Sequence, residues 1–197
     1  MQETNHTTEA IEVHALIKDR KSPRAFRSEE VTPEQLEALF EAARWAPSAM
    51  NEQPWRFVYA TREQKEDFDR LLSCLAEANQ VWAKNASVLL LTVAKTTYSA
   101  NDKPNTHAWH DTALATANLV FQATAMDLHV HQMGGFSAAK AREELGIPEG
   151  YEPVTMVAVG YIGDPDSLPE HLRTRELAPR TRKPQEEIVF QGKWQQK

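Results

Sequence analysis

The sequence predicts an α+β fold in a single domain of 197 residues. Segments with strand and helix patterns are mixed along the chain without the regular alternation of a βαβ protein. Hydrophobic residues make up 41% of the chain and charged residues 25%, which is an ordinary globular balance. The length suits one domain with a sizeable core, or one protomer of an obligate dimer.

The first half of the chain alternates between helix and strand signals. Thr32 precedes Pro33 and stands three residues before Gln35, the pattern of a capped helix start. Pro47 ends this helix, and the apolar run over residues 87–94 is short enough for a buried strand. The elements predicted here are a helix over 9–18, a helix from Thr32 to Pro47, a loop over 46–54, a strand over 55–60, a helix over 62–77 and a strand over 87–94.

The second half is predicted to hold one long helix and one further strand. A polar, mobile loop over 95–106 leads into a helix over 107–128, whose many small residues allow close helix packing. Ser137 caps a short helix to Leu145, which Gly146 ends. The next predicted strand spans 154–161.

The two ends of the chain are expected to lie outside the core. Residues 1–8 are polar and predicted to be flexible. Residues 164–197 are rich in proline and charge, so we expect an extended C-terminal arm that wraps over the domain or over a partner subunit. Within this arm, Ile188–Phe190 is apolar and is predicted to add an edge strand.

Composition excludes several classes of protein. No apolar run approaches the roughly 18 residues that span a bilayer, and the N-terminal residues lack a signal-peptide pattern. The only cysteine, Cys74, excludes an internal disulfide and favours a reducing cytoplasm. A net charge of −6 disfavours general nucleic-acid binding.

Positive charge is nevertheless concentrated near both ends. Residues 18–27 contain five basic residues and one acidic residue, and residues 171–197 contain seven Lys or Arg and three Glu. Two solvated surfaces would explain this, and so would one anion site assembled by folding. Arginine side chains bind phosphate oxygens in a bidentate manner, and Ser22 within Arg20–Arg24 adds a neutral donor.

Two further segments could contact a ligand. The loop Ala46–Trp55 contains prolines, Asn51 and Gln53, whose amides could recognise the edge of a planar ring, although they could equally cap nearby backbone. The adjacent glycines Gly134 and Gly135 permit positive φ and close backbone approach, or mark a simple turn. The pairs His107/His110 and His129/His131 lack further ligands, so no metal site is predicted.

Together these segments resemble the nitroreductase family of FMN-dependent NAD(P)H oxidoreductases. Residues 20–26 follow its Arg-Arg-Ser-x-Arg-x-Phe pattern, with Lys21 at the second position, and residues 46–55 follow its Ala-Pro-Ser-x-x-Asn-x-Gln-Pro-Trp loop. The Gly-Gly-Phe turn at 134–136 and the Arg-Thr-Arg at 180–182 also match. The resemblance covers residues 12 to 194.

The resemblance implies a three-layer sandwich with a mainly antiparallel central sheet. It also implies an intertwined homodimer whose C-terminal extension wraps the partner, with FMN at the subunit interface. Arg20, Ser22, Arg180 and Arg182 would hold the phosphate and ribityl, and Arg24 would lie near the flavin N1–C2 edge. The other implied contacts are Lys21, Pro47, Ser48, Met50, Asn51, Gln53, Met133, Gly134 and Gly135.

The implied activity is a ping-pong cycle through flavin N5, from NAD(P)H to a nitroaromatic, a quinone or a similar acceptor. No side-chain nucleophile is needed. A flavin-sequestering protein with little turnover would carry the same motifs, and so would a specialised member such as a dehalogenase. Met126-Asp127-Leu128 departs from the family's usual Gly-Leu, and the loop over 95–106 has no assigned role, so the acceptor stays open.

Overall fold

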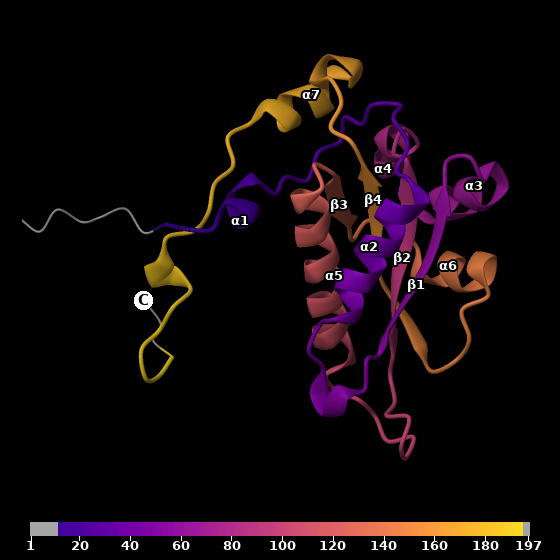
Figure 1. Ribbon diagram of the computed structural model, residues 1–197, viewed down its shortest axis with the longest axis vertical. Coiled ribbons are helices and arrows are strands. Elements are labelled where there is room, and N and C mark those ends of the chain that lie inside the picture. Colours follow the sequence, from indigo (N-terminus) through magenta and orange to yellow (C-terminus); the bar gives the residue numbers. More distant parts are fainter. Residues whose placement is uncertain (1–11, 195–197) are drawn as a thin grey trace, which may run out of the picture.

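The structure is a computed structural model that describes residues 12–194 (Figure 1). A four-stranded sheet with the order β1-β2-β4-β3 forms its centre, and all neighbouring strands are antiparallel. The strands are β1 (Trp55–Thr61), β2 (Val88–Lys95), β3 (His129–Met133) and β4 (Tyr151–Gly160). β1 and β3 are therefore the edges of the sheet.

Helices cover both faces of this sheet (Figure 1). The helices are α1 (Ala15–Asp19), α2 (Pro33–Arg44), α3 (Lys65–Cys74), α4 (Glu77–Ala83), α5 (Ala108–Ala125), α6 (Ala138–Leu145) and α7 (Glu170–Leu177). Short 3-10 turns occur at η1 (Ala49–Asn51), η2 (Pro165–Ser167) and η3 (Gln185–Glu187). α2 and α5 pack on one face, and α3, α4 and α6 on the other, which confirms the predicted three-layer α+β sandwich.

The central strands have apolar side chains on both faces because successive residues of a strand point in opposite directions. Leu89 and Leu91 of β2 join the core beneath α3 and α4. Val88 and Leu90 join the core beneath α2 and α5. All four side chains are at most 1% exposed, which explains the uninterrupted apolar run that predicted this strand.

Local end signals in the sequence are confirmed by hydrogen bonds. Thr32 Oγ1 accepts from the Gln35 amide at 3.2 Å, and Gln35 Oε1 accepts from the Thr32 amide at 2.9 Å, so α2 begins with a complete capping box. Ser137 caps α6 by accepting from the Lys140 amide. Gly146 ends that helix with φ +63°, in the left-handed region that glycine adopts readily.

Other predicted elements differ from the structure. The helix predicted over 62–77 begins only at Lys65 and is followed by a separate helix, α4. β3 and α7 were not predicted, because β3 is a short edge strand with polar residues and α7 buries only Leu172. Of the helix predicted over 9–18, α1 covers the last part; residues 9–11, and the segment 1–8 predicted to be flexible, lie outside the described residues.

The predicted edge strand at Ile188–Phe190 is wrong for the chain by itself. These residues follow η3, and Ile188 and Val189 are 61% and 65% exposed. The arm leaves the domain after α7, so no strand of the same chain lies beside it (Figure 1). α7 itself belongs to the domain, because Leu168 and Leu172 are buried in the core.

Candidate cofactor site

Folding brings the two basic segments together. We call Arg20–Arg24 the N-terminal cluster and Arg180–Lys183 the C-terminal cluster. The Arg180 guanidinium donates to the carbonyl oxygens of Arg20 and Lys18, each at 2.7 Å. Figure 1 shows the two segments side by side where the arm leaves the domain. Of the two explanations for the charge pattern, the structure favours one shared anion site.

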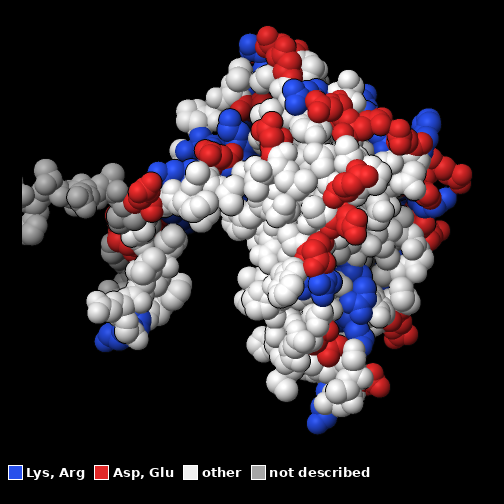
Figure 2. All heavy atoms as spheres, viewed as in Figure 1, with Lys and Arg blue, Asp and Glu red and all other residues white. Residues whose placement is uncertain are grey.

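A hollow of about 540 Å³ lies between the clusters. Six cationic side chains contribute to its lining: Arg20, Lys21, Arg24, Arg175, Arg180 and Arg182. Ser22 lines it as well, and its hydroxyl accepts from Arg20 Nη1 at 2.9 Å. Figure 2 shows blue side chains gathered over the same junction of arm and domain. The hollow is lined by all four residues that the resemblance assigns to the phosphate and ribityl: Arg20, Ser22, Arg180 and Arg182.

The charge in this pocket is only partly balanced. Partial burial lowers the pKa of Arg20 below its ordinary value, and the positive charges of Arg182 and then Arg180 lower it further. Like charges disfavour one another at such distances, so a bound anion would relieve the repulsion. Glu176 is the one carboxylate in the described lining. The residues therefore fit a phosphate dianion by both geometry and charge.

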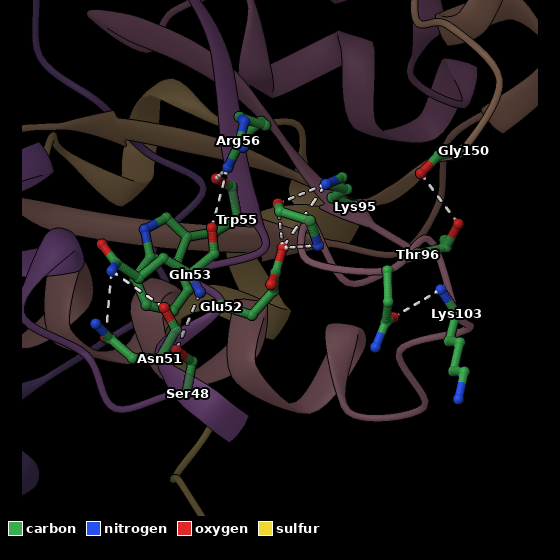
Figure 3. Close-up of polar contacts among 12 residues, drawn as sticks. Ser48, Asn51, Glu52, Gln53, Trp55, Arg56, Lys95, Thr96, Lys103 and Gly150 are labelled. Carbon is green, nitrogen blue, oxygen red and sulfur yellow. Dashed lines mark hydrogen bonds and ion pairs between the residues drawn. The ribbon is translucent and has the colours of Figure 1, made fainter.

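The loop Ala46–Pro54 is held in a strained shape. Met50, Asn51 and Gln53 have φ values of +56°, +54° and +52°, a region that costs non-glycine residues about 1–3 kcal/mol each. Such strain persists where surrounding contacts fix the backbone, and it is concentrated at functional sites. Ser48 Oγ accepts from the Gln53 amide at 3.0 Å, and the Gln53 side chain donates to Asn51 (Figure 3). Met50 is 89% exposed and free to contact a ligand or a partner.

Glu52 ties this loop to the segment 96–105 (Figure 3). Its Oε1 accepts from the Ser99 amide at 2.9 Å and from the Ser99 hydroxyl at 2.6 Å, with Lys95 Nζ 3.7 Å away. These bonds, led by the Ser99 hydroxyl, hold the pKa of Glu52 below its ordinary value. The Glu52 side chain is only 9% exposed. The segment predicted to be mobile is thus anchored at Ser99, within its turn.

Asp111 anchors the same loop from below. Its Oδ2 accepts from the Ala49 amide at 2.9 Å, and the residue is 3% exposed. The sequence interpretation missed this role. A usable signal was present, since Asp111 stands four residues before Ala115 and eight before Leu119, on the buried face of α5.

The glycine turn follows β3. Gly134 and Gly135 are exposed, and neither has the positive φ that adjacent glycines permit. A Cβ on Gly135 would lie 2.8 Å from Asn79 Nδ2, whereas the space beside Gly134 is open. The Met133 side chain is 3% exposed in the core, so Met133 could offer a ligand only its backbone.

The loop and the basic pocket lie at opposite ends of the sheet. Trp55, which follows the loop, pairs with Ala94, and Tyr151 pairs with Lys95 at this end of β4. The N-terminal cluster lies beyond the other end of β4, where Phe26 bridges Ile162. β4 has ten residues, so the two places are about 30 Å apart. One chain therefore does not bring all the expected ligand contacts together.

In the two histidine pairs, His131 and His110 have polar contacts, whereas the buried Nδ1 of His129 has no hydrogen-bond partner in the described residues. His131 Nδ1 lies 2.8 Å from the Pro23 carbonyl oxygen, which can only accept, so this nitrogen carries the proton. Burial lowers the pKa of both His131 and His129. His110 Nδ1 lies 3.1 Å from Asp111 Oδ1. Within residues 12–194, no three His, Cys, Asp or Glu side chains are grouped as metal ligands.

A larger groove of about 930 Å³ lies between α2 and β1. Phe40 and Tyr59 are among its apolar residues. Five glutamates and two arginines share its lining: Glu30, Glu34, Glu37, Glu41, Glu63, Arg44 and Arg62. This acidic balance opposes phosphate binding, so the smaller basic pocket is the better candidate for the anion.

Comparison with known proteins identifies related chains. A family model described as "Nitroreductase family" matches residues 17–161. A solved structure described as an oxidoreductase containing FMN superposes on this chain with a TM-score of 0.90 and is 38% identical in sequence. The alignment covers 100% of both chains.

Two further relatives agree. A nitroreductase family protein from Clostridium difficile 630 is 28% identical with a TM-score of 0.71, over 91% of this chain and 97% of that one. A protein of Archaeoglobus fulgidus provisionally named an NADH dehydrogenase/NAD(P)H nitroreductase is 28% identical over 76% of this chain and 84% of its own. In the described part of the chain, no helix is long and apolar enough to cross a membrane.

Proposed function

Because the chain belongs to the nitroreductase family, we propose that it is an FMN-dependent oxidoreductase that uses NAD(P)H to reduce a small conjugated acceptor, such as a nitroaromatic or a quinone. The observation that carries this proposal is the convergence of two distant basic clusters on one cationic pocket. The 38% identical structure described as containing FMN supports the choice of cofactor.

The chain's own residues bind and orient the cofactor. Arg20, Arg180 and Arg182 neutralise the phosphate through charge-assisted hydrogen bonds, and the Ser22 hydroxyl adds a neutral one. When bound, FMN supplies the two-electron chemistry at N5, from NAD(P)H to the acceptor in a ping-pong cycle. Arg24 would place positive charge near the N1–C2 edge, where reduction of the flavin leaves negative charge. No atom lies within 4 Å of the Cβ position of Gly134, so a flavin could approach the backbone there, and the Gly134 and Gly135 amides would face its N5 edge.

The second half of each site comes from a second copy of the chain. Pro47, Ser48, Met50, Asn51 and Gln53 lie about 30 Å from the basic pocket of their own chain, a distance set by the length of β4. In a homodimer, the loop of one subunit lines the flavin whose phosphate the other subunit holds. The exposure of Met50 supports this arrangement. Methionine side chains are normally buried, and a partner subunit would cover this one.

The arm offers a means of holding the two copies together. Ile188 and Val189 are exposed in their own chain, and β1 pairs only with β2 in the described residues, so its other edge is free. Edge strands with free backbone groups pair readily with another chain. We therefore move the predicted edge strand of Ile188–Phe190 to the partner's sheet, where the arm would wrap that subunit.

Two general predictions accompany this proposal. We expect the chain to form one domain followed by an extended C-terminal arm. Because α7 packs on the core, this arm starts after Leu177. A cytoplasmic location stays a prediction that rests on the lone thiol of Cys74, which is buried.

Anaerobic reduction tests the function. Protein loaded with FMN is mixed with NADH or with NADPH, and the flavin absorbance band is followed before a quinone or a nitroaromatic is added. The proposal expects the band to bleach and then to return with turnover. A protein that binds FMN but shows no turnover with either nicotinamide would be a flavin-sequestering protein, and one that binds no FMN would refute the proposal.

A further inference from the structure

A carboxylate lies inside the basic pocket. Glu176 of α7 lines it together with six cationic side chains. Its two oxygens accept from the Arg24 amide at 2.9 and 3.0 Å, and Oε2 lies 3.4 Å from Arg24 Nη1. The Glu176 side chain is only 8% exposed. A buried negative charge opposes the binding of a phosphate nearby, so Glu176 must serve a different role.

Among residues 12–194, the hydrogen bonds of Glu176 are all with Arg24. A carboxylate that accepts two bonds from one backbone amide fixes the main chain at that residue, and its ion pair fixes the side chain as well. Pairs of this kind are costly to break when one partner is removed, because the other charge is left uncompensated. His131 supports the same turn by donating to the Pro23 carbonyl. Arg24 is therefore held from both sides, and its charge is partly offset.

We propose that Glu176 is a positioning residue that fixes Arg24 beside the flavin and, by offsetting its charge, lowers the reduction potential of the flavin. This inference rests on the proposed function. A cation at the N1–C2 edge stabilises the reduced, anionic form of the cofactor. A carboxylate paired with that cation removes part of this stabilisation, so the reduced flavin gives up its electrons to an acceptor more readily.

The substitution Glu176→Gln tests the charge and keeps the shape. The glutamine carbonyl can still accept from the Arg24 amide, while the negative charge is gone. We expect reduced FMN to bind on the order of tenfold more tightly relative to oxidised FMN, as for one charge-assisted hydrogen bond. For a two-electron couple this is a positive shift of about 30 mV in midpoint potential. The matched control, Glu170→Gln, removes the same charge from an exposed position on α7 and is expected to leave the potential unchanged.

The same substitution in protein that lacks Arg24 shows whether Glu176 acts through Arg24. In Arg24→Gln protein, adding Glu176→Gln is expected to produce a much smaller shift, since the guanidinium that Glu176 fixes and offsets is already gone. A purely structural role would move stability and FMN affinity but would not give a potential shift that depends on Arg24. An unchanged or lowered potential in Glu176→Gln, or an equal shift in both backgrounds, would overturn the proposal.

A folding defect would not leave the question open. Glu176→Asp keeps the charge but withdraws it by one methylene, and it is expected to raise the potential by less than Glu176→Gln. If neither variant folds, Glu176 is a structural residue and the proposal is overturned. Wild-type protein that binds no FMN would refute the proposed function itself, which separates the two failures.

Discussion

Arg20 is the residue on which the phosphate assignment most depends. Its pKa is lowered by burial and by the neighbouring charges of Arg182 and Arg180, so it lies close to two further cations. The sequence predicted these cations individually, because arginine forks beside a serine suit phosphate. It could not predict Glu176 among them, since a glutamate in a charged tail has no local pattern that marks it as buried.

Replacing Arg20 with alanine is expected to weaken FMN binding. Removing one charge-assisted hydrogen bond to the phosphate costs about 1.5–3 kcal/mol, which raises the dissociation constant at least about tenfold. Flavin fluorescence titration measures this change. Lys193→Ala is the matched control, because Lys193 lies on the same arm outside the pocket lining. Equal affinities in Arg20→Ala and wild type would show that the phosphate lies elsewhere.

The buried His131 is expected to make the stability of the folded protein depend on pH. Burial lowers the pKa of His131 below its ordinary value of 6.5, so the folded state favours the neutral ring. The contribution of His131 to the free energy of unfolding is therefore complete above pH 6.5. It is lost as the pH falls below that value, because the unfolded chain takes up the proton first. The slope for one group is at most about 1.4 kcal/mol per pH unit.

Urea unfolding at several pH values checks this dependence. His131→Asn is expected to be less stable at neutral pH and to show a shallower decline on acidification than wild type. His171→Asn, which changes an exposed histidine of α7, is expected to keep the wild-type slope. A wild-type slope in His131→Asn would show that other groups dominate.

At the scale of elements, the sequence predicted best where one short segment decides the outcome. The capping box at Thr32, the stop at Gly146 and the buried strand β2 all follow from neighbouring residues. β3 and α7 were missed because their apolar contacts come from segments far away in the sequence. The loop Ala46–Pro54 was recognised by its composition, but the partners of its anchors, Ala49 for Asp111 and Ser99 for Glu52, became visible only in three dimensions.

Glu52→Gln is expected to release the segment 96–105 from this loop. The variant loses the ionic acceptor for Ser99 and the pairing with Lys95, while the core stays intact. Hydrogen exchange at the Ser99 amide reports this directly, and we expect it to become faster together with a weaker affinity for FMN. Glu37→Gln, an exposed change on α2, serves as the control. Unchanged exchange at Ser99 would show that Glu52 does not hold the segment.

At the scale of the whole molecule, the arm and the divided site lead to the same expectation. The arm exposes Ile188 and Val189, and the loop lies an entire strand length from the pocket. Sequence alone could not assign contacts to subunits, because that assignment depends on the distance along β4. Both features are accounted for by a dimer in which each copy completes the other's site.

Val189→Glu is expected to weaken this dimer. A charge on the arm's apolar segment opposes its burial against a partner, so size-exclusion chromatography with light scattering should show more monomer and the sample should hold less FMN. Gln191→Glu adds the same charge two residues away at an exposed polar position and is expected to stay dimeric. A Val189→Glu protein that is dimeric and fully loaded would contradict the role given to the arm.

Arg20–Arg24 and Arg180–Lys183 are proposed to form one site for the phosphate of FMN. Parallel titrations of the wild-type protein with FMN and with riboflavin, which lacks only the phosphate, test it most directly. We expect riboflavin to bind at least about tenfold more weakly for each charge-assisted hydrogen bond that only the phosphate can accept, and added salt to reduce this difference in affinity. Equal affinity for the two flavins would show that these two clusters do not hold the phosphate.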